Sequence, residues 1–191
     1  MTDKKRIAIL ASGSGTNAEQ IVKHFDGHRD IEVALILSNN PDAFVLERAK
    51  RLQVPSKAFG RNQFRESEVL KWLAEYAITH VVLAGFLWLI PSSWLQTFPN
   101  RIINIHPALL PKYGGKGMYG ENVHKAVKEA GDNETGITIH LVNAHYDEGK
   151  MLFQAKCIIA DEDSPADIAA KVHQLEYQHY PSQIEKWILG S

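Results

Sequence analysis

An asparagine and a histidine stand two residues apart near the middle of the chain, Asn104 and His106, where an apolar run ends. In a strand, residues i and i+2 point to the same side. An amide donor beside an imidazole is what acyl transfer requires, because the oxyanion that develops on the attacked carbonyl needs preorganised donors. The imidazole also carries a proton near neutral pH. Pro107 and Pro111 end the strand and stiffen the segment that follows. On the spacing alone, a histidine at the end of a strand is more often a structural residue with a hydrogen bond than a catalyst.

Four short apolar runs predict the strands that position this pair: residues 6–12, 31–39, 80–86 and 102–106. Each run is bounded by Gly, Asn or Pro, as buried parallel strands are. Amphipathic patterns at 17–25, 43–52 and 63–76 predict helices between them. The first half therefore reads as a Rossmann-like, doubly wound α/β unit.

The second half has a different character. A Gly-rich loop, YGGKGMYGEN (113–122), leads to a helix from about Asn122 and to two strand-like segments, 134–142 and 151–160. Long glycine loops are often functional. A last helix opens at 161–165, and Pro181 should kink or break it. We predict one α/β domain over 1–191 with a mostly parallel sheet.

Composition limits the classes of partner. The 191 residues are 45% hydrophobic, and 21 Lys and Arg balance 22 Asp and Glu to a net charge of −1. A nucleic-acid partner would favour a basic surplus, so small molecules are expected instead. No run approaches the ~20 apolar residues of a membrane span, which predicts a cytoplasmic protein. The single Cys157 excludes an internal disulfide, and no histidine pair has a zinc spacing, so no metal is expected.

The turn after the first predicted strand, SGSGTN (12–17), contains candidate phosphate-binding groups. Glycines allow a ligand to approach the backbone closely, and the free amides at the start of a helix favour an anion. The turn lacks the Gly-Lys-Ser/Thr ending of a Walker loop and the G-x-G-x-x-G dinucleotide pattern. A Gly-rich turn that binds nothing has equal weight on these residues alone.

The string NIHPALLPKY (104–113) resembles the signature of the folate-dependent formyltransferases, in particular the glycinamide ribonucleotide formyltransferases, with Ala108 in place of a Ser. The resemblance extends over nearly the whole chain. It implies the formyltransferase fold and transfer of a formyl group from 10-formyltetrahydrofolate to the amine of 5-phosphoribosylglycinamide, in purine biosynthesis. A monomer or weak homodimer without metal would be expected.

The resemblance assigns two groups of positions to the ribonucleotide. The loop residues receive its phosphate, with Thr16 in place of a Ser, and the last helix contributes a ribose-binding Glu176 and His173, where relatives have Lys or Gln. These positions are Gly15, Thr16, Asn17, His173, Gln174, Leu175 and Glu176.

The resemblance also implies a set of residues that bind the folate. LAGFLWLI (83–90) resembles the segment that walls the pterin pocket, with Trp88 in place of an Arg, and the loop NAHYD (143–147) resembles the one that wraps the pterin. Arg61 matches an Arg near the folate tail. These positions are Arg61, Leu87, Trp88, Leu89, Ile90, Asn104, Asn143, Ala144, His145, Tyr146 and Asp147.

The catalytic residues implied by the resemblance are Asn104, His106 and Asp147. A protonated His106 and the Asn104 amide would stabilise the oxyanion, and Asp147 would raise the pKa of His106 by its charge. The alternatives are a formyltransferase acting on an amino sugar nucleotide or methionyl-tRNA, a formyl-folate hydrolase, and a non-catalytic folate- or phosphate-binding protein.

Overall fold

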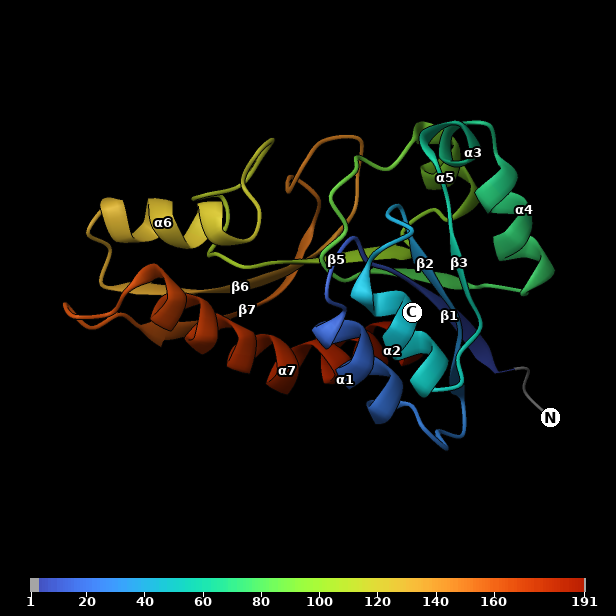
Figure 1. The fold of residues 1–191 in the computed structure, drawn as a ribbon, viewed down its shortest axis with the longest axis horizontal. Coiled ribbons are helices and arrows are strands. Elements are labelled where there is room, and N and C mark those ends of the chain that lie inside the picture. The colour runs from blue at the N-terminus through green and yellow to red at the C-terminus, as the bar shows by residue number, and fades with distance from the viewer. Residues whose placement is uncertain (1–3, 191) are drawn as a thin grey trace.

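A computed structural model describes residues 4–190. Its centre is a seven-stranded sheet in the order β3-β2-β1-β4-β5-β6-β7 (Figure 1). The strands are β1 (Lys5–Leu10), β2 (Ile31–Ser38), β3 (Ser56–Ala58), β4 (His80–Leu83), β5 (Ile102–His106), β6 (Glu134–Leu141) and β7 (Met151–Ile158). Pairings from β3 to β5 are parallel, and those of β6 with β5 and β7 are antiparallel. The predicted α/β fold with a mostly parallel sheet is confirmed; the three-residue β3 and the short helix Ser92–Thr97 were not predicted.

Two hydrophobic layers hold helices against the two faces of the sheet. The helices are α1 (Thr16–His24), α2 (Phe44–Arg51), α3 (Arg61–Arg65), α4 (Glu68–Glu75), α5 (Ser92–Thr97), α6 (Glu121–Glu129) and α7 (Pro165–Leu189). One core contains apolar residues of α1, α2, α6 and α7, and the other contains those of α3, α4 and α5. Figure 1 shows α1, α2 and α7 together along one side of the sheet. None of the helices within residues 4–190 combines the length and the apolar content needed to cross a membrane.

Two features of the predicted helices are corrected: one helix is divided, and α7 is not broken at Pro181. The helix expected over 63–76 is divided into α3 and α4, because Ser67 adopts a left-handed backbone with φ 66° that a right-handed helix cannot include. The α7 helix runs unbroken through Pro181 to Leu189. Proline removes one backbone hydrogen bond, but Tyr180 and Ile184 on either side of it are fully buried. Packing against the sheet therefore holds the helix together.

The sheet topology creates a crevice at one edge. The chain leaves β1 toward β2 on one side and returns through β4 on the other side, so the loops after β1 and β4 diverge. In open α/β sheets ligands bind at such a switch point, outside the carboxyl ends of the strands. The loop 12–17, the segment 83–90 and the end of β5 meet at this edge.

Candidate active site

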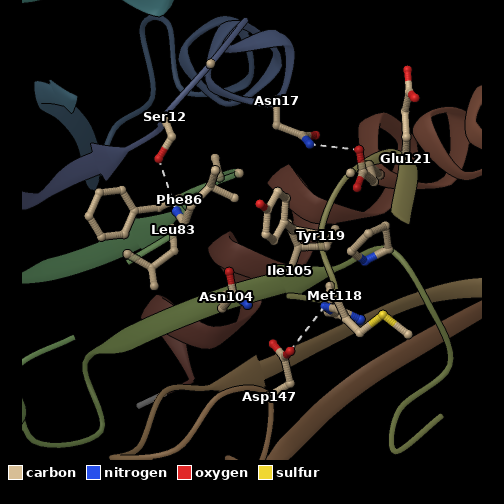
Figure 2. Close-up of a pocket in the computed structure, with 18 of the residues that line it drawn as sticks. Ser12, Asn17, Leu83, Phe86, Asn104, Ile105, Met118, Tyr119, Glu121 and Asp147 are labelled. Carbon is tan, nitrogen blue, oxygen red and sulfur yellow. Dashed lines mark hydrogen bonds and ion pairs between the residues drawn. The ribbon is translucent and has the colours of Figure 1, made fainter. Parts of the chain in front are cut away.

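A cavity of about 1190 Å³ opens at the carboxyl ends of β1, β4 and β5. Figure 2 shows Asn17, Asn104, Tyr119 and Asp147 arranged around it, although they come from different parts of the chain. Its lining includes both the Gly-rich turn after β1 and the apolar segment after β4. A pocket with an apolar wall and a few polar groups is the usual form of a small-molecule site.

Asn104 and His106 both line this cavity, as their spacing predicts. The Asn104 amide Nδ2 donates to His140 Nε2 at 3.1 Å, and His140 Nδ1 in turn donates to the Leu141 carbonyl at 2.8 Å. His106 Nε2 donates to the Tyr113 carbonyl at 2.7 Å. Both side chains are thus held in place by groups outside β5.

Asp147 lies between two imidazoles. Its Oδ2 accepts a hydrogen bond from the Gly115 amide at 2.9 Å and lies 3.5 Å from His106 Nδ1, while its Oδ1 lies 3.6 Å from His140 Nε2. Its backbone is left-handed, with φ 58°, a conformation that Asp tolerates better than most residues. The loop after β6 therefore brings the carboxylate to the end of β5.

Burial and charge act in opposite directions on the pKa of these groups. Burial favours the neutral form of Asp147, but the nearby His140 ring, the charge of His106 and the hydrogen bond from the Gly115 amide outweigh it and lower the pKa of the carboxyl. Burial also favours neutral His106, and here Asp147 and the Tyr113 carbonyl offset it only in part, so the pKa of His106 is lowered. The expected increase of that pKa is thus not found, because the loss of water outweighs the carboxylate. Without substrate the imidazole is favoured in its neutral form.

The turn after β1 presents open backbone amides. Gly15, which precedes α1, has φ 73°, and α1 has no side-chain cap at its first turn. A Cβ atom at Gly15 would lie 2.3 Å from Val45 Cγ2, so only glycine fits there. The first amides of a helix have no partner within the helix and favour an anion.

The last helix faces this turn. Glu176 is buried, and its Oε2 accepts from Asn17 Nδ2 at 2.9 Å and lies 2.9 Å from His173 Nδ1. The hydrogen bond with Glu176 raises the pKa of His173 although burial opposes it. One turn later the Tyr180 hydroxyl donates to the Leu83 carbonyl at 2.8 Å, which fixes α7 against β4. His173 and Glu176 line the cavity, whereas Gln174 and Leu175 are not among its lining residues.

The apolar wall follows β4. Leu87, Trp88, Leu89 and Ile90 all line the cavity, as expected of a wall for a flat ligand. A second cavity of about 320 Å³ adjoins it and shares Leu87, Trp88 and Leu89. Arg61 lines this second cavity, with its guanidinium 4.5 Å above the Trp88 ring. Arg61 therefore lies beside the main cavity and outside it.

Only part of the loop 143–147 lines the cavity. His145, Tyr146 and Asp147 line the cavity, but Asn143 and Ala144 are not among its lining residues. Asn143 Oδ1 instead accepts a hydrogen bond from the His145 amide at 2.9 Å. Asn143 shapes the turn that carries the other three residues.

Comparison with known proteins assigns the chain to a family. The model of the family described as formyl transferase matches residues 5–184. The chain belongs to this family. It is 39% identical to the phosphoribosylglycinamide formyltransferase of Haemophilus influenzae, over 96% of this chain and 86% of that protein. For the Bacillus subtilis protein of the same name the identity is 35%, over 97% and 95%.

Solved structures agree with the family assignment. The glycinamide ribonucleotide transformylase 1 of Symbiobacterium toebii superimposes with a TM-score of 0.90 at 32% identity, covering 100% of this chain and 90% of that one. The phosphoribosylglycinamide formyltransferase of Bacillus halodurans gives a TM-score of 0.87 at 36% identity, covering 95% and 94%. This formyl transferase is an α/β enzyme of the same fold.

Several cavity residues of the formyl transferase were missed in the sequence. They lie in the Gly-rich loop and at the start of α6: Lys116, Met118, Tyr119 and Lys125. His124, which matches a family histidine, also lines the cavity. His124 is buried, and its Nδ1 has no hydrogen-bond partner among residues 4–190. The glycines of the loop signalled a functional segment, but its path over the cavity depends on contacts with Asp147. No group of three or more His, Cys, Asp or Glu in the described part of the chain is arranged to hold a metal ion.

Proposed function

We propose that this formyl transferase moves the formyl group of 10-formyltetrahydrofolate to the amine of 5-phosphoribosylglycinamide. The observation that carries the proposal is the position of Asn104, His106 and Asp147 in one cavity, between an uncapped helix N-terminus and an apolar wall. Both substrates are small molecules. Residues 1–191 act as one formyltransferase domain, as a monomer or weak homodimer.

The phosphate of the ribonucleotide binds the amides of Gly15, Thr16 and Asn17, where the dipole of α1 favours negative charge. Glu176 binds the ribose hydroxyls, since its carboxylate is already oriented by Asn17 and His173. This leaves the glycinamide amine directed toward the end of β5. His173 adds positive charge on the α7 side.

The folate lies along Leu87–Ile90 and under the loop 143–147. An apolar wall with a few fixed polar groups suits a flat heterocycle that carries polar edges. The glutamate tail extends toward the second cavity, where the guanidinium of Arg61 pairs with its carboxylate. Trp88 shapes that passage by stacking on Arg61.

The amine attacks the formyl carbon, a C–N bond forms, and the bond from that carbon to the folate nitrogen then breaks. Asn104 uses one amide hydrogen on His140 and has the other for the oxyanion. His106 supplies the second donor by exchanging the Tyr113 carbonyl for the oxyanion. It takes up a proton from solvent as negative charge develops and returns that proton when the carbonyl re-forms. Asp147 stabilises the imidazolium and assists the transfer of the amine's surplus proton to the leaving nitrogen.

The test is to incubate the purified protein with 10-formyltetrahydrofolate and a panel of amine acceptors, and to identify products by mass spectrometry. The account predicts formylated phosphoribosylglycinamide as the main product. Formylation of an amino sugar nucleotide or methionyl-tRNA instead would contradict the acceptor. Formate release with every acceptor would indicate a hydrolase.

A further inference from the structure

The α2 helix contacts three successive residues of the turn after β1. The Val45 amide donates to the Gly13 carbonyl at 3.1 Å, and Arg48 Nε donates to the Ser14 carbonyl at 2.7 Å. The Val45 side chain fills the space beside Gly15. The turn therefore rests on α2.

Arg48 makes the widest set of these contacts. Besides the Ser14 carbonyl, its guanidinium forms an ion pair with Glu19 of α1 and lies 5.0 Å above the ring of Phe44. Its side chain is only 19% exposed. A planar guanidinium with several donors can hold a carbonyl and a carboxylate together, which an ammonium does less well.

These contacts orient the amides of the turn. In a trans peptide the carbonyl and the following N–H point in opposite directions. Because α2 holds the Gly13 and Ser14 carbonyls, the N–H groups of Ser14 and Gly15 point away from α2. Neither N–H has a hydrogen-bond acceptor among residues 4–190, and both residues line the cavity.

We propose that Arg48 is a positioning residue for the phosphate group of the acceptor. It holds the Ser14 carbonyl turned away from the cavity, so that the next amide faces the anion, and its ion pair with Glu19 fixes the guanidinium behind the turn. The inference rests on the proposed function only for the identity of the phosphate ester. Arg48 itself acts through the turn and does not touch the reacting atoms.

A matched control exists one turn away. Arg51 lies 5.5 Å above the same Phe44 ring and is exposed, but among the described residues it makes no hydrogen bond to the turn. Arg51→Met thus removes a similar charge and a similar ring contact. Only Arg48→Met also releases the Ser14 carbonyl.

The experiment measures kcat and the KM of each substrate for wild type, Arg48→Met, Arg48→Lys and Arg51→Met. We expect Arg48→Met to raise the KM of the ribonucleotide by about 10-fold or more, the usual effect of losing a charged hydrogen bond. The kcat and the KM of the formyl donor should stay within about 2-fold of wild type. Arg48→Lys should recover part of the loss, and Arg51→Met should match wild type.

The second readout is the rise in Tm caused by ribose 5-phosphate, which does not depend on turnover. We expect the rise in wild type and Arg51→Met and its loss in Arg48→Met. No rise in wild type, an equal rise in both variants, or a fall in kcat without a change in KM would overturn the role of Arg48. If wild type binds ribose 5-phosphate but shows no ribonucleotide-dependent turnover, the proposed function fails, and the thermal shifts still decide the role of Arg48.

Discussion

At the scale of single residues, the site holds a neutral imidazole beside an ionised carboxylate. The position of Asn104 and His106 on one side of β5 could be predicted, because the two-residue period of a strand is a local property. The direction of the His106 pKa could not be predicted. It depends on how far Tyr113 and the loop of Asp147 exclude water, and that loop is distant from His106 in sequence.

Replacing the Asp147 carboxylate should change both the pKa of His106 and the rate of turnover. In Asp147→Asn the pKa of His106 should fall further, because the charge of Asp147 raises it. We expect kcat to fall by about 100-fold, since the imidazolium loses its partner. NMR titration of His106 and steady-state kinetics measure both effects, with the exposed Asp161→Asn as control. An unchanged His106 pKa together with normal kcat would contradict the assignment.

His173 should make phosphate binding depend on pH. Its pKa is raised by Glu176, so the charged form persists to higher pH than for an ordinary histidine and is lost as the pH rises through the raised value. We therefore expect the KM of the ribonucleotide to increase over that range. In His173→Gln, which keeps a donor but does not titrate, this part of the increase should vanish. Equal pH profiles for the two proteins would remove His173 from the phosphate site.

At the scale of elements, the sequence predicts strands and helices well where local pattern and packing agree. The prediction failed at Ser67, where the backbone is left-handed, and at Pro181, where packing decided the outcome. The apolar residues on either side of Ser67 continue the helical pattern, so the backbone reversal left no local signal. At Pro181 the local signal was present, but burial of the neighbouring side chains overcame it.

The junction between α1 and α2 can be tested at Gly15. Gly15→Ala combines a left-handed backbone with a clash against Val45, and we expect a loss of about 2–4 kcal/mol in unfolding free energy. Gly27→Ala is the control, because Gly27 has φ 68° but nothing within 4 Å of a Cβ; it should cost about 1 kcal/mol. Urea denaturation compares the two. If both variants lose the same stability, the contact with Val45 does not restrict residue 15.

At the scale of the whole molecule, the buried histidines should make the fold sensitive to acid. Burial lowers the pKa of His80 from 6.5 to about 4, and it also lowers those of His106 and His124. A lowered histidine pKa means that the unfolded chain binds more protons, so stability falls as the pH decreases through 6.5 and continues to fall until about 4.

His80 alone should contribute about 3 kcal/mol to this loss. Denaturation midpoints measured from pH 7.5 downward should show a steeper decline in wild type than in His80→Gln. The exposed His145→Gln should follow wild type. A His80→Gln profile parallel to that of wild type would show that burial of His80 is not coupled to acid unfolding.

The sequence could also predict where the molecule places its site. Diverging loops at the carboxyl edge follow from the α/β topology, and the two motifs after β1 and β5 were assigned to that edge correctly. The position of the Gly-rich loop could not be predicted from the sequence. Tyr119 and His124 line the cavity, but the path of their segment depends on contacts such as that of the Gly115 amide with Asp147, which is distant in sequence, so the shape of the cavity mouth required the structure.

The most direct test of the account is the initial rate of donor consumption, followed spectroscopically with and without 5-phosphoribosylglycinamide, in wild type and in a folded His106→Ala variant. The account predicts consumption that depends on the ribonucleotide and falls by about 100- to 1000-fold in the variant. Consumption independent of the ribonucleotide, or a near-normal rate in His106→Ala, would contradict it.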